Sequence, residues 1–421
     1  MIAELVHPRP LADVPPIRMP TFRAVWLGLV FMSSGVQFYA IAITWLVLQL
    51  TGSSAQLGTI LAVAAVPRAI TMLISGAIID RTQPRQLLVF TALGNGVIVA
   101  LLSALLAFDG LTLVILAGAG ALMGLMDAFF YPTSFSLIPR IVHPARMAQA
   151  NALMQGADGF INMVAPALSG FVVALFGLPL ALTFNAILFL TGALFMRGLG
   201  HVQLSDEATD TTAPSESRLQ AVLNGFRYVL RNPALRWALL AIAALNFAAI
   251  GPIIVGGAVL VQGRFDGGAE MYGVFLASFG IGGLIGALIA ASLPAIRRPG
   301  RVLIWTGASL GMALIAIGFT QTFWLAFAIM LAASIIVGAS MPFFSAWLQQ
   351  ETPLAMQGRI ASLSTFAAVA VDPFSQGTAG FLSQIDVTLA FGAAGGLLLL
   401  IALVVALSPV AQMEAKGIAP S

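Results

Sequence analysis

The chain has 421 residues, of which 59% are hydrophobic and only 8% are charged, whereas about 25% of residues are charged in an ordinary soluble domain. This composition excludes a soluble enzyme, a nucleic-acid-binding protein and a disordered chain. The sequence contains no cysteine, which excludes disulfides, thiol catalysis and cysteine-ligated metal sites. The high hydrophobic and low charged content indicates a protein embedded in a lipid bilayer.

The first 21 residues are rich in proline and contain no apolar run, so we expect no cleavable signal peptide there. A helix needs about 20 apolar residues to cross the hydrocarbon layer. Twelve stretches meet this requirement: 22–50, 55–79, 86–108, 111–137, 149–176, 178–196, 235–261, 271–293, 302–320, 323–348, 360–382 and 387–410. They are long and do not alternate as barrel strands do. The predicted fold is therefore an all-α membrane protein, with twelve transmembrane helices in two six-helix bundles.

The basic residues predict the orientation. With the N-terminus in the cytoplasm, 17 of the 19 lysines and arginines fall in cytoplasmic segments. Of the other two, Arg264 lies outside and Arg68 lies within a span. This bias follows the positive-inside rule. It predicts a multi-pass protein of the cell (plasma or inner) membrane with both termini in the cytoplasm.

The longest polar stretch, 200–217, separates six spans from six. After it, apolar and basic residues recur at helical spacing over 218–231, which predicts an amphipathic helix on the cytoplasmic membrane face. We therefore predict an N-terminal segment, a first bundle, a linker with this helix, a second bundle and a cytoplasmic tail, with the bounds 1–21, 22–198, 199–234, 235–410 and 411–421.

The two halves show short matches about 210 residues apart. Pro132 corresponds to Pro342, and the pair Gly170-Phe171 corresponds to Gly380-Phe381. Together these matches favour a duplicated six-helix unit. One large class of transporters is built from such repeats around a central site.

The turn after the second predicted span reads GAIIDRTQPR, from Gly76 to Arg85. Gly76 would let a neighbouring helix pack closely, and Asp80 could pair with Arg81, with Arg85 or with a cation across the interface between the halves. Alternatively, the segment is only a turn whose charges set the topology. Motif and position resemble the loop signature of the major facilitator superfamily. The resemblance implies the fold of that superfamily and a gating role for Gly76, Asp80, Arg81 and Arg85.

Within the superfamily, short stretches in both halves resemble the exporters related to the enterobactin and macrolide efflux proteins. They are LTGSS at 50–54, PR at 67–68, FRYVLRNP at 226–233 and GRI at 358–360. The fifth span reads APALSG at 165–170, where an antiporter signature would read GPxxGG. Pro166 and Gly170 are kept, and the two other glycines are replaced by small residues. We expect these positions to serve close helix packing.

Four charged residues lie deep inside predicted spans: Arg68, Asp127, Asp158 and Asp372. A charge at the bilayer centre costs at least ~2.5–3.5 kcal/mol, which makes such residues functional candidates, here for proton coupling. Arg68 and Asp127 lie at matched depth in one half, so we expect them to pair or to share a network; such a pair could also only fix packing. Asp158 could instead face water or only cap local polar groups. Asp372 has no basic partner in its own half.

The superfamily fold implies that spans one, four, seven and ten line a central cavity. Candidates for substrate contact are Gln37, Tyr39, Phe130, Tyr131 and Asn246. An apolar, aromatic pocket with few polar groups suits an amphipathic ligand. Each aromatic residue could instead face lipid or another helix.

The sequence contains no phosphate-binding loop, and its only lysine is Lys416, so we expect no direct use of ATP. The predicted function is that of a secondary active transporter, not an enzyme, which exports a small drug- or siderophore-like molecule by proton antiport with alternating access. Its expected partners are that molecule, protons and the lipid bilayer, without cofactor, metal or nucleic acid, and the expected state is a monomer. An importer or facilitator on the same fold, and a scaffold or membrane subunit of an ATP-driven complex, stay open as alternatives.

Overall fold

The computed structural model describes residues 14–79, 82–199, 218–294, 299–353 and 356–408, and the regular elements in these ranges are helices. The first half contains five long helices: α1 (Pro20–Thr51), α2 (Ser54–Ile79), α3 (Pro84–Ala107), α4 (Leu113–Ile141) and α5 (Met147–Arg197). The second half begins with α6 (Arg218–Arg231) and continues with α7 (Pro233–Gly251), α8 (Gly257–Gly263), α9 (Ala269–Ser292), α10 (Pro299–Phe319), α11 (Phe323–Glu351), α12 (Gln357–Val369), α13 (Asp372–Ile385) and α14 (Val387–Leu407).

The all-α fold with twelve spans is confirmed, although the helix count needs interpretation. Ten helical stretches in the described ranges are long and apolar enough to cross a membrane. One of them contains two spans, because Gly177 interrupts α5 with a φ of 77°, a conformation that suits glycine. This turn lies between the two spans predicted to end at 176 and to begin at 178. The remaining span, the eleventh in chain order, is divided into α12 and α13, which meet at Ala370 and Val371.

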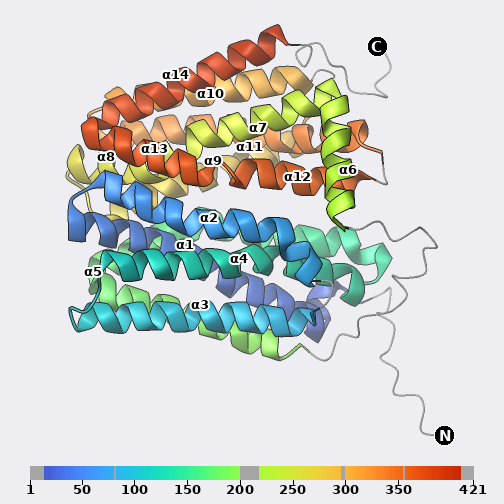
Figure 1. Ribbon diagram of the computed structural model, residues 1–421, viewed down its shortest axis with the longest axis horizontal. Coiled ribbons are helices and arrows are strands. Elements are labelled where there is room, and N and C mark those ends of the chain that lie inside the picture. The colour runs from blue at the N-terminus through green and yellow to red at the C-terminus, as the bar shows by residue number, and fades with distance from the viewer. Residues whose placement is uncertain (1–13, 80–81, 200–217, 295–298, 354–355, 409–421) are drawn as a thin grey trace, which may run out of the picture.

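The helices form two layers, α1–α5 in one and α7–α14 in the other (Figure 1). In the first layer α5 packs against α1 and α3, and α2 packs against α4. In the second, α9 packs against α11, and α10 packs against α14. Helix α6 lies across one end of the second layer. We call this end the α6 side, and we call the opposite end, which carries Gly52, Gly177 and Asp386, the distal side.

Helix α6 has the bounds that the sequence predicts. Gly225 approaches Leu363 and Arg359 of α12, and Val229 is buried in a cluster with Leu235. On the other side of the helix, Phe226, Arg227, Leu230 and Arg231 are exposed. An apolar pair beside two arginines is the pattern of a helix at a membrane surface.

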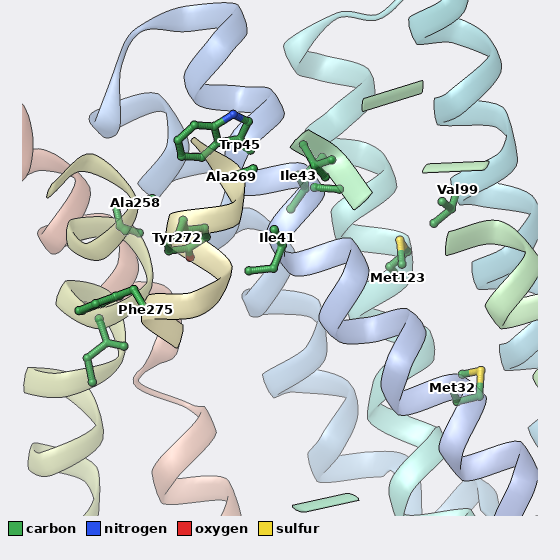
Figure 2. Packing of buried hydrophobic residues seen from close by; sticks show 14 of the residues in the cluster. Met32, Ile41, Ile43, Trp45, Val99, Met123, Ala258, Ala269, Tyr272 and Phe275 are labelled. Carbon is green, nitrogen blue, oxygen red and sulfur yellow. The ribbon is translucent and has the colours of Figure 1, made fainter. Parts of the chain in front are cut away.

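The largest apolar cluster joins the two layers on the distal side. It includes Ile41 and Trp45 of α1 together with Ala269, Tyr272 and Phe275 of α9 (Figure 2). The rings of Trp45 and Tyr272 stack with centroids 6.4 Å apart. The two halves are thus sealed together at this end by buried aromatic side chains.

Two helices accept a side chain into their backbone ladder at equivalent places in the halves. In α7, the Ser375 hydroxyl donates to the Phe247 carbonyl at 2.5 Å and accepts from the Gly251 N–H at 2.7 Å. The π-helical turn Pro252–Gly256 follows directly. In α1, the amide of buried Asn185 lies 2.9 Å from the Gly35 carbonyl and 2.9 Å from the Tyr39 N–H. Each side chain holds two groups that an α-helix normally pairs with each other, which marks both helices as places to bend.

The topology gives a first testable prediction. Single cysteines at 83 and 143 lie on the α6 side, and those at 109 and 266 lie on the distal side. Cysteines at 210 and 299 would also be expected in the cytoplasm, but the side chains at these two positions lie outside the described set. We expect a membrane-impermeant thiol reagent to label 109 and 266 from outside intact cells, and 83 and 143 only after permeabilisation. The natural absence of cysteine makes the unmodified chain the blank. Labelling of 83 or 143 in intact cells would contradict the predicted orientation.

Candidate functional site

Helices α2 and α13 form one of the two most extensive contacts that join the halves. The Ser54 hydroxyl donates to the Gly380 carbonyl at 3.0 Å, and a Cβ on Gly58 would lie only 2.5 Å from the Gln376 carbonyl oxygen. Further toward the α6 side, a Cβ on Gly377 would meet Ala62 at 4.0 Å. The two helices run antiparallel, so residue numbers rise along α2 as they fall along α13. The contact is therefore tightest on the distal side and loosens toward the middle of the helices.

This contact ends at an ion pair in the middle of the membrane-spanning region. Arg68 Nη2 of α2 lies 3.9 Å from Asp372 Oδ2, the first residue of α13. The Arg68 side chain is 43% exposed and that of Asp372 is 13% exposed. The positive end of the α13 dipole also favours a carboxylate at this position.

In this structure the expected direct pair of Arg68 with Asp127 is not formed, because the ion pair of Arg68 crosses to the other half. Matched depth does not determine direction around a helix, and α2 lies between α4 of its own half and α13 of the other. The alternative of a shared network remains, since the charge of Arg68 acts on Asp127. Asp372, for which the sequence predicted no basic partner in its own half, has one across the interface.

Asp127 lies inside the first bundle. Its Oδ1 accepts a hydrogen bond of 2.9 Å from Asn95 Nδ2 of α3, a buried residue that sequence analysis missed. Tyr39 is a further electrostatic neighbour of Asp127, and its hydroxyl lies beside Gly120 of α4. These contacts place Asp127 and Tyr39 between helices of one half.

The second contact between the halves is formed by α5 and α9. A Cβ on Gly170 would lie 2.3 Å from the Ala269 carbonyl oxygen, and a Cβ on Gly273 would lie 2.3 Å from that of Pro166. Both predicted packing positions, Pro166 and Gly170, thus lie where two backbones touch. The contact continues to Gly280, which approaches Asn162. Beyond this point a Cβ on Gly159 would have no neighbour within 4 Å.

A polar cluster begins where α5 and α9 separate. Asp158 Oδ1 accepts hydrogen bonds from the Ser33 hydroxyl at 2.8 Å and from the Tyr131 hydroxyl at 3.1 Å. Its Oδ2 accepts from Asn162 Nδ2 at 3.2 Å, and Asn162 Oδ1 accepts from Gln37 Nε2 at 2.6 Å. We call these five residues of α1, α4 and α5 the Asp158 cluster.

The chemistry of the cluster follows from its donors. Four neutral side chains surround one carboxylate, and none of the described residues forms an ion pair with it. Ser33 and Tyr131 are also 2.9 Å apart, so two hydroxyl protons serve three mutually close oxygen atoms. The carboxylate could therefore bind the cationic or hydrogen-bond-donating group of a ligand.

The Asp158 cluster unites three predicted residues, Gln37, Tyr131 and Asp158, with two that were missed, Ser33 and Asn162. The missed residues each lie four positions from a predicted one, Ser33 before Gln37 and Asn162 after Asp158. Residues at this spacing share a helix face. A search for polar side chains at this spacing within apolar spans would have found both.

The other substrate candidates lie elsewhere. Phe130 is 1% exposed in the core of the first bundle, packed edge-on against Tyr131, so it does not contact substrate in this conformation. Asn246 donates to the Ile242 carbonyl of its own helix at 2.9 Å.

The predicted gating loop is described in part. Gly76 lies in the last turn of α2, and its surroundings are outside the described set; Asp80 and Arg81 also fall outside the described residues. Arg85, at the start of α3, donates to the Arg197 carbonyl at 2.8 Å. This bond ties α3 to the end of α5 within the same half.

The comparisons with known proteins agree with this architecture. Residues 11–421 match the family described as transmembrane secretion effector. The chain is 25% identical to the multidrug efflux pump Tap of Mycolicibacterium fortuitum over 382 residues, which cover 88% of this chain and 89% of that protein. It is 24% identical to the enterobactin exporter EntS of Escherichia coli O1:K1 over 394 residues, which cover 91% and 90%.

Among solved structures, a bacterial homologue of the iron transporter ferroportin in its inward-facing state superimposes with a TM-score of 0.68 at 18% identity. That match covers 92% of this chain and 98% of the other, and it shows a common fold. A family match over nearly the whole length, together with the two-layer helical fold, identifies the chain as a multi-pass membrane transporter of the transmembrane secretion effector family, within the major facilitator superfamily.

Proposed function

We propose that this protein exports a small amphipathic molecule across the cell membrane by alternating access, in exchange for protons. The observation that carries the proposal is the asymmetric contact between the halves. Backbones touch from the distal side as far as Gly58 and Gly280, and on the α6 side of these contacts lie an ion pair and a polar cluster. If the α6 side is cytoplasmic, this is the conformation in which an exporter loads its substrate.

In this proposal the Asp158 cluster binds the polar part of the substrate. Asn162 is exposed, and Asp158, Gln37 and Tyr131 are half-buried. Because Asn162 also forms the last contact with α9, the cluster lies on the face of α5 turned toward the other half. Aromatic and apolar side chains of the neighbouring helices suit the apolar part of the molecule.

The substrate class follows from the relatives. Tap is named a multidrug efflux pump and EntS an enterobactin exporter, so a drug- or siderophore-like molecule is the class to test. Protons supply sufficient energy, because one charge that moves down 100 mV releases about 2.3 kcal/mol. This free energy supports a gradient of roughly 50-fold at 1.4 kcal/mol per decade.

The experiment uses the purified full chain alone in liposomes, without ATP. A pH gradient is imposed across the liposome membrane, and ethidium, a macrolide and a catecholate siderophore are each tested for accumulation driven by that gradient. We expect at least one to accumulate in the acidic compartment, and a protonophore to abolish this accumulation. Protein-free liposomes are the control. Movement that ignores the pH gradient would contradict antiport, and absence of movement for all three would contradict export of this substrate class.

A further inference from the structure

Arg68 is the one described cation placed to act on two intramembrane carboxylates, one in each half. It forms its ion pair with Asp372 of α13, and its charge also acts on Asp127 of α4. These two relations differ in kind, because one crosses the interface between the halves and the other lies within a single bundle.

The distance between Arg68 and Asp127, within the first bundle, is fixed by the tight packing of α2 against α4. A Cβ on Gly124 of α4 would lie 2.2 Å from the Ala64 carbonyl oxygen and 3.4 Å from Arg68 Cβ. Asp127 follows Gly124 by three residues and therefore lies on the same side of α4. Any movement that keeps this bundle intact leaves Arg68 beside Asp127.

The distance between Arg68 and Asp372, across the interface, depends on how the two halves are positioned relative to each other. The ion pair lies at the end of the α2–α13 contact, and Asp372 begins α13 directly after the break at Ala370 and Val371. When the halves move so that the distal side opens, α13 leaves α2 and Asp372 leaves Arg68. Asp127 is then the carboxylate that remains within reach of the guanidinium.

A carboxylate that loses its cation in this region favours the neutral form, because its charge is poorly solvated. Among the described helices packed against α13, α7 contributes Arg236 near its start, α12 contributes Arg359, and the π-helical turn and α14 contribute no charged side chain. Arg68 is therefore the cation that faces Asp372. Gln376, one turn along α13, lies on the same helix face as Asp372. Its buried Oε1 has no hydrogen-bond partner, so it can serve as an acceptor for a protonated carboxyl at Asp372.

We propose that Asp372 is a proton-binding site and that Arg68 exchanges between Asp127 and Asp372 as the protein changes conformation. With the distal side open, Arg68 pairs with Asp127, and Asp372 takes a proton from the distal medium. With the distal side closed, as in this structure, Arg68 pairs with Asp372 and the proton leaves toward the α6 side. One proton is bound and one released in each cycle. The exchange deepens the proposed antiport and rests on it only for the direction of substrate movement.

The test measures conformation and needs no substrate. Spin labels on cysteines at Gln56 and Ile385 report the distal side, and labels at Ala148 and Ser292 report the α6 side; all four positions are exposed. In the otherwise unmodified chain, acidification from about pH 8 to about pH 6 should shift the population toward the distal-open state, by up to about 100-fold in the ratio for a single titrating group.

The two acid variants should shift the equilibrium in opposite directions. Asp372→Asn frees Arg68 for Asp127, so we expect the distal-open state at both pH values. Asp127→Asn leaves Arg68 only Asp372, so we expect the distal-closed state at both. Arg68→Gln should remove the pH dependence, and Arg68→Lys should retain it. Asp109→Asn, a matched change of an exposed distal acid whose φ of 54° asparagine tolerates, should behave like the parent chain.

Equal shifts for Asp372→Asn and Asp127→Asn, or a pH response that survives both Asp372→Asn and Arg68→Gln, would overturn the exchange. A purely structural pair would lower the unfolding temperature without these opposite shifts. Because the distances are measured without substrate, failure of the export proposal would leave this result intact, and failure of the exchange would leave substrate movement in liposomes unexplained but measurable.

Discussion

Replacing Gly380 by alanine should hold the distal side open and abolish most transport, with the fold preserved. The new Cβ would lie 2.6 Å from the Ser54 carbonyl oxygen and 2.8 Å from Gly58 Cα. Both are backbone atoms, which cannot turn aside as a flexible side chain can. Overpacking of this kind costs about 1–3 kcal/mol. The cost applies only while α2 and α13 touch, so it should shift the equilibrium toward the distal-open state by roughly 5- to 150-fold at 1.4 kcal/mol per decade.

The matched control is one turn away on the same helix. A Cβ on Gly377 would meet only Ala62, at the ordinary distance of 4.0 Å, so Gly377→Ala should transport normally. Gly170→Ala tests the other interface, with Gly159→Ala as its control, since a Cβ on Gly159 meets nothing within 4 Å. Distal-side spin-label distances and substrate flux are the readouts. Normal closure in Gly380→Ala would show that the α2–α13 contact is not the distal seal.

Gly170 and Gly380 show how far the repeat in the sequence could be interpreted. Gly170 and Gly380, 210 residues apart, were recognised as equivalent positions. In the structure each lies where a helix of its own half meets a backbone of the other half, Gly170 against Ala269 and Gly380 against Ser54. The sequence predicts that the positions correspond. Only the packing of the halves reveals that the equivalence is one of interfaces.

The twelve spans could be predicted because length and hydropathy determine which segments cross a bilayer. Even the turn at Gly177 was placed to the residue. The break between α12 and α13 was not predicted, because Ala370 and Val371 themselves carry no helix-breaking signal. The one such signal nearby is Pro373, which lies in the first turn of α13. Likewise, the insertion of Ser375 into the ladder of α7 depends on a tertiary contact that no local pattern encodes.

The candidate site could be predicted by residue type but not by partnership. Scarcity of charge identified Arg68, Asp127, Asp158 and Asp372 correctly as unusual, because any charge in a span is costly. Depth estimated from residue counts then suggested Asp127 as the partner of Arg68, whereas this structure pairs Arg68 with Asp372, since depth leaves the rotation of each helix undetermined. Rotation depends on packing, and in this protein close contacts at glycines, such as Gly124 against Ala64, are part of that packing.

The largest loss of transport from a single isosteric change should come from Asp158→Asn. The amide keeps the volume of the carboxylate, and its oxygen can still accept from the Ser33 and Tyr131 hydroxyls. We therefore expect the unfolding temperature in detergent to fall by only a few degrees, as a change of about 1 kcal/mol would cause. Removal of the negative charge eliminates the feature that we propose binds the polar part of the substrate. Hydrogen bonds to charged groups contribute about 1.5–3 kcal/mol, which corresponds to a loss of roughly 10- to 150-fold in apparent affinity.

Neighbouring changes separate the charge from the hydrogen bonds around it. Tyr131→Phe removes one hydroxyl and leaves the carboxylate with Ser33 at 2.8 Å, so transport should fall less than in Asp158→Asn. Asp158→Glu keeps the charge and should retain part of the activity, while Asp109→Asn removes an acid from the distal surface and should have no effect. If Tyr131→Phe lost as much as Asp158→Asn, the cluster would act through its geometry. If Asp158→Asn transported normally, the carboxylate would have no part in binding, because its charge is the property that distinguishes it from the four neutral side chains around it.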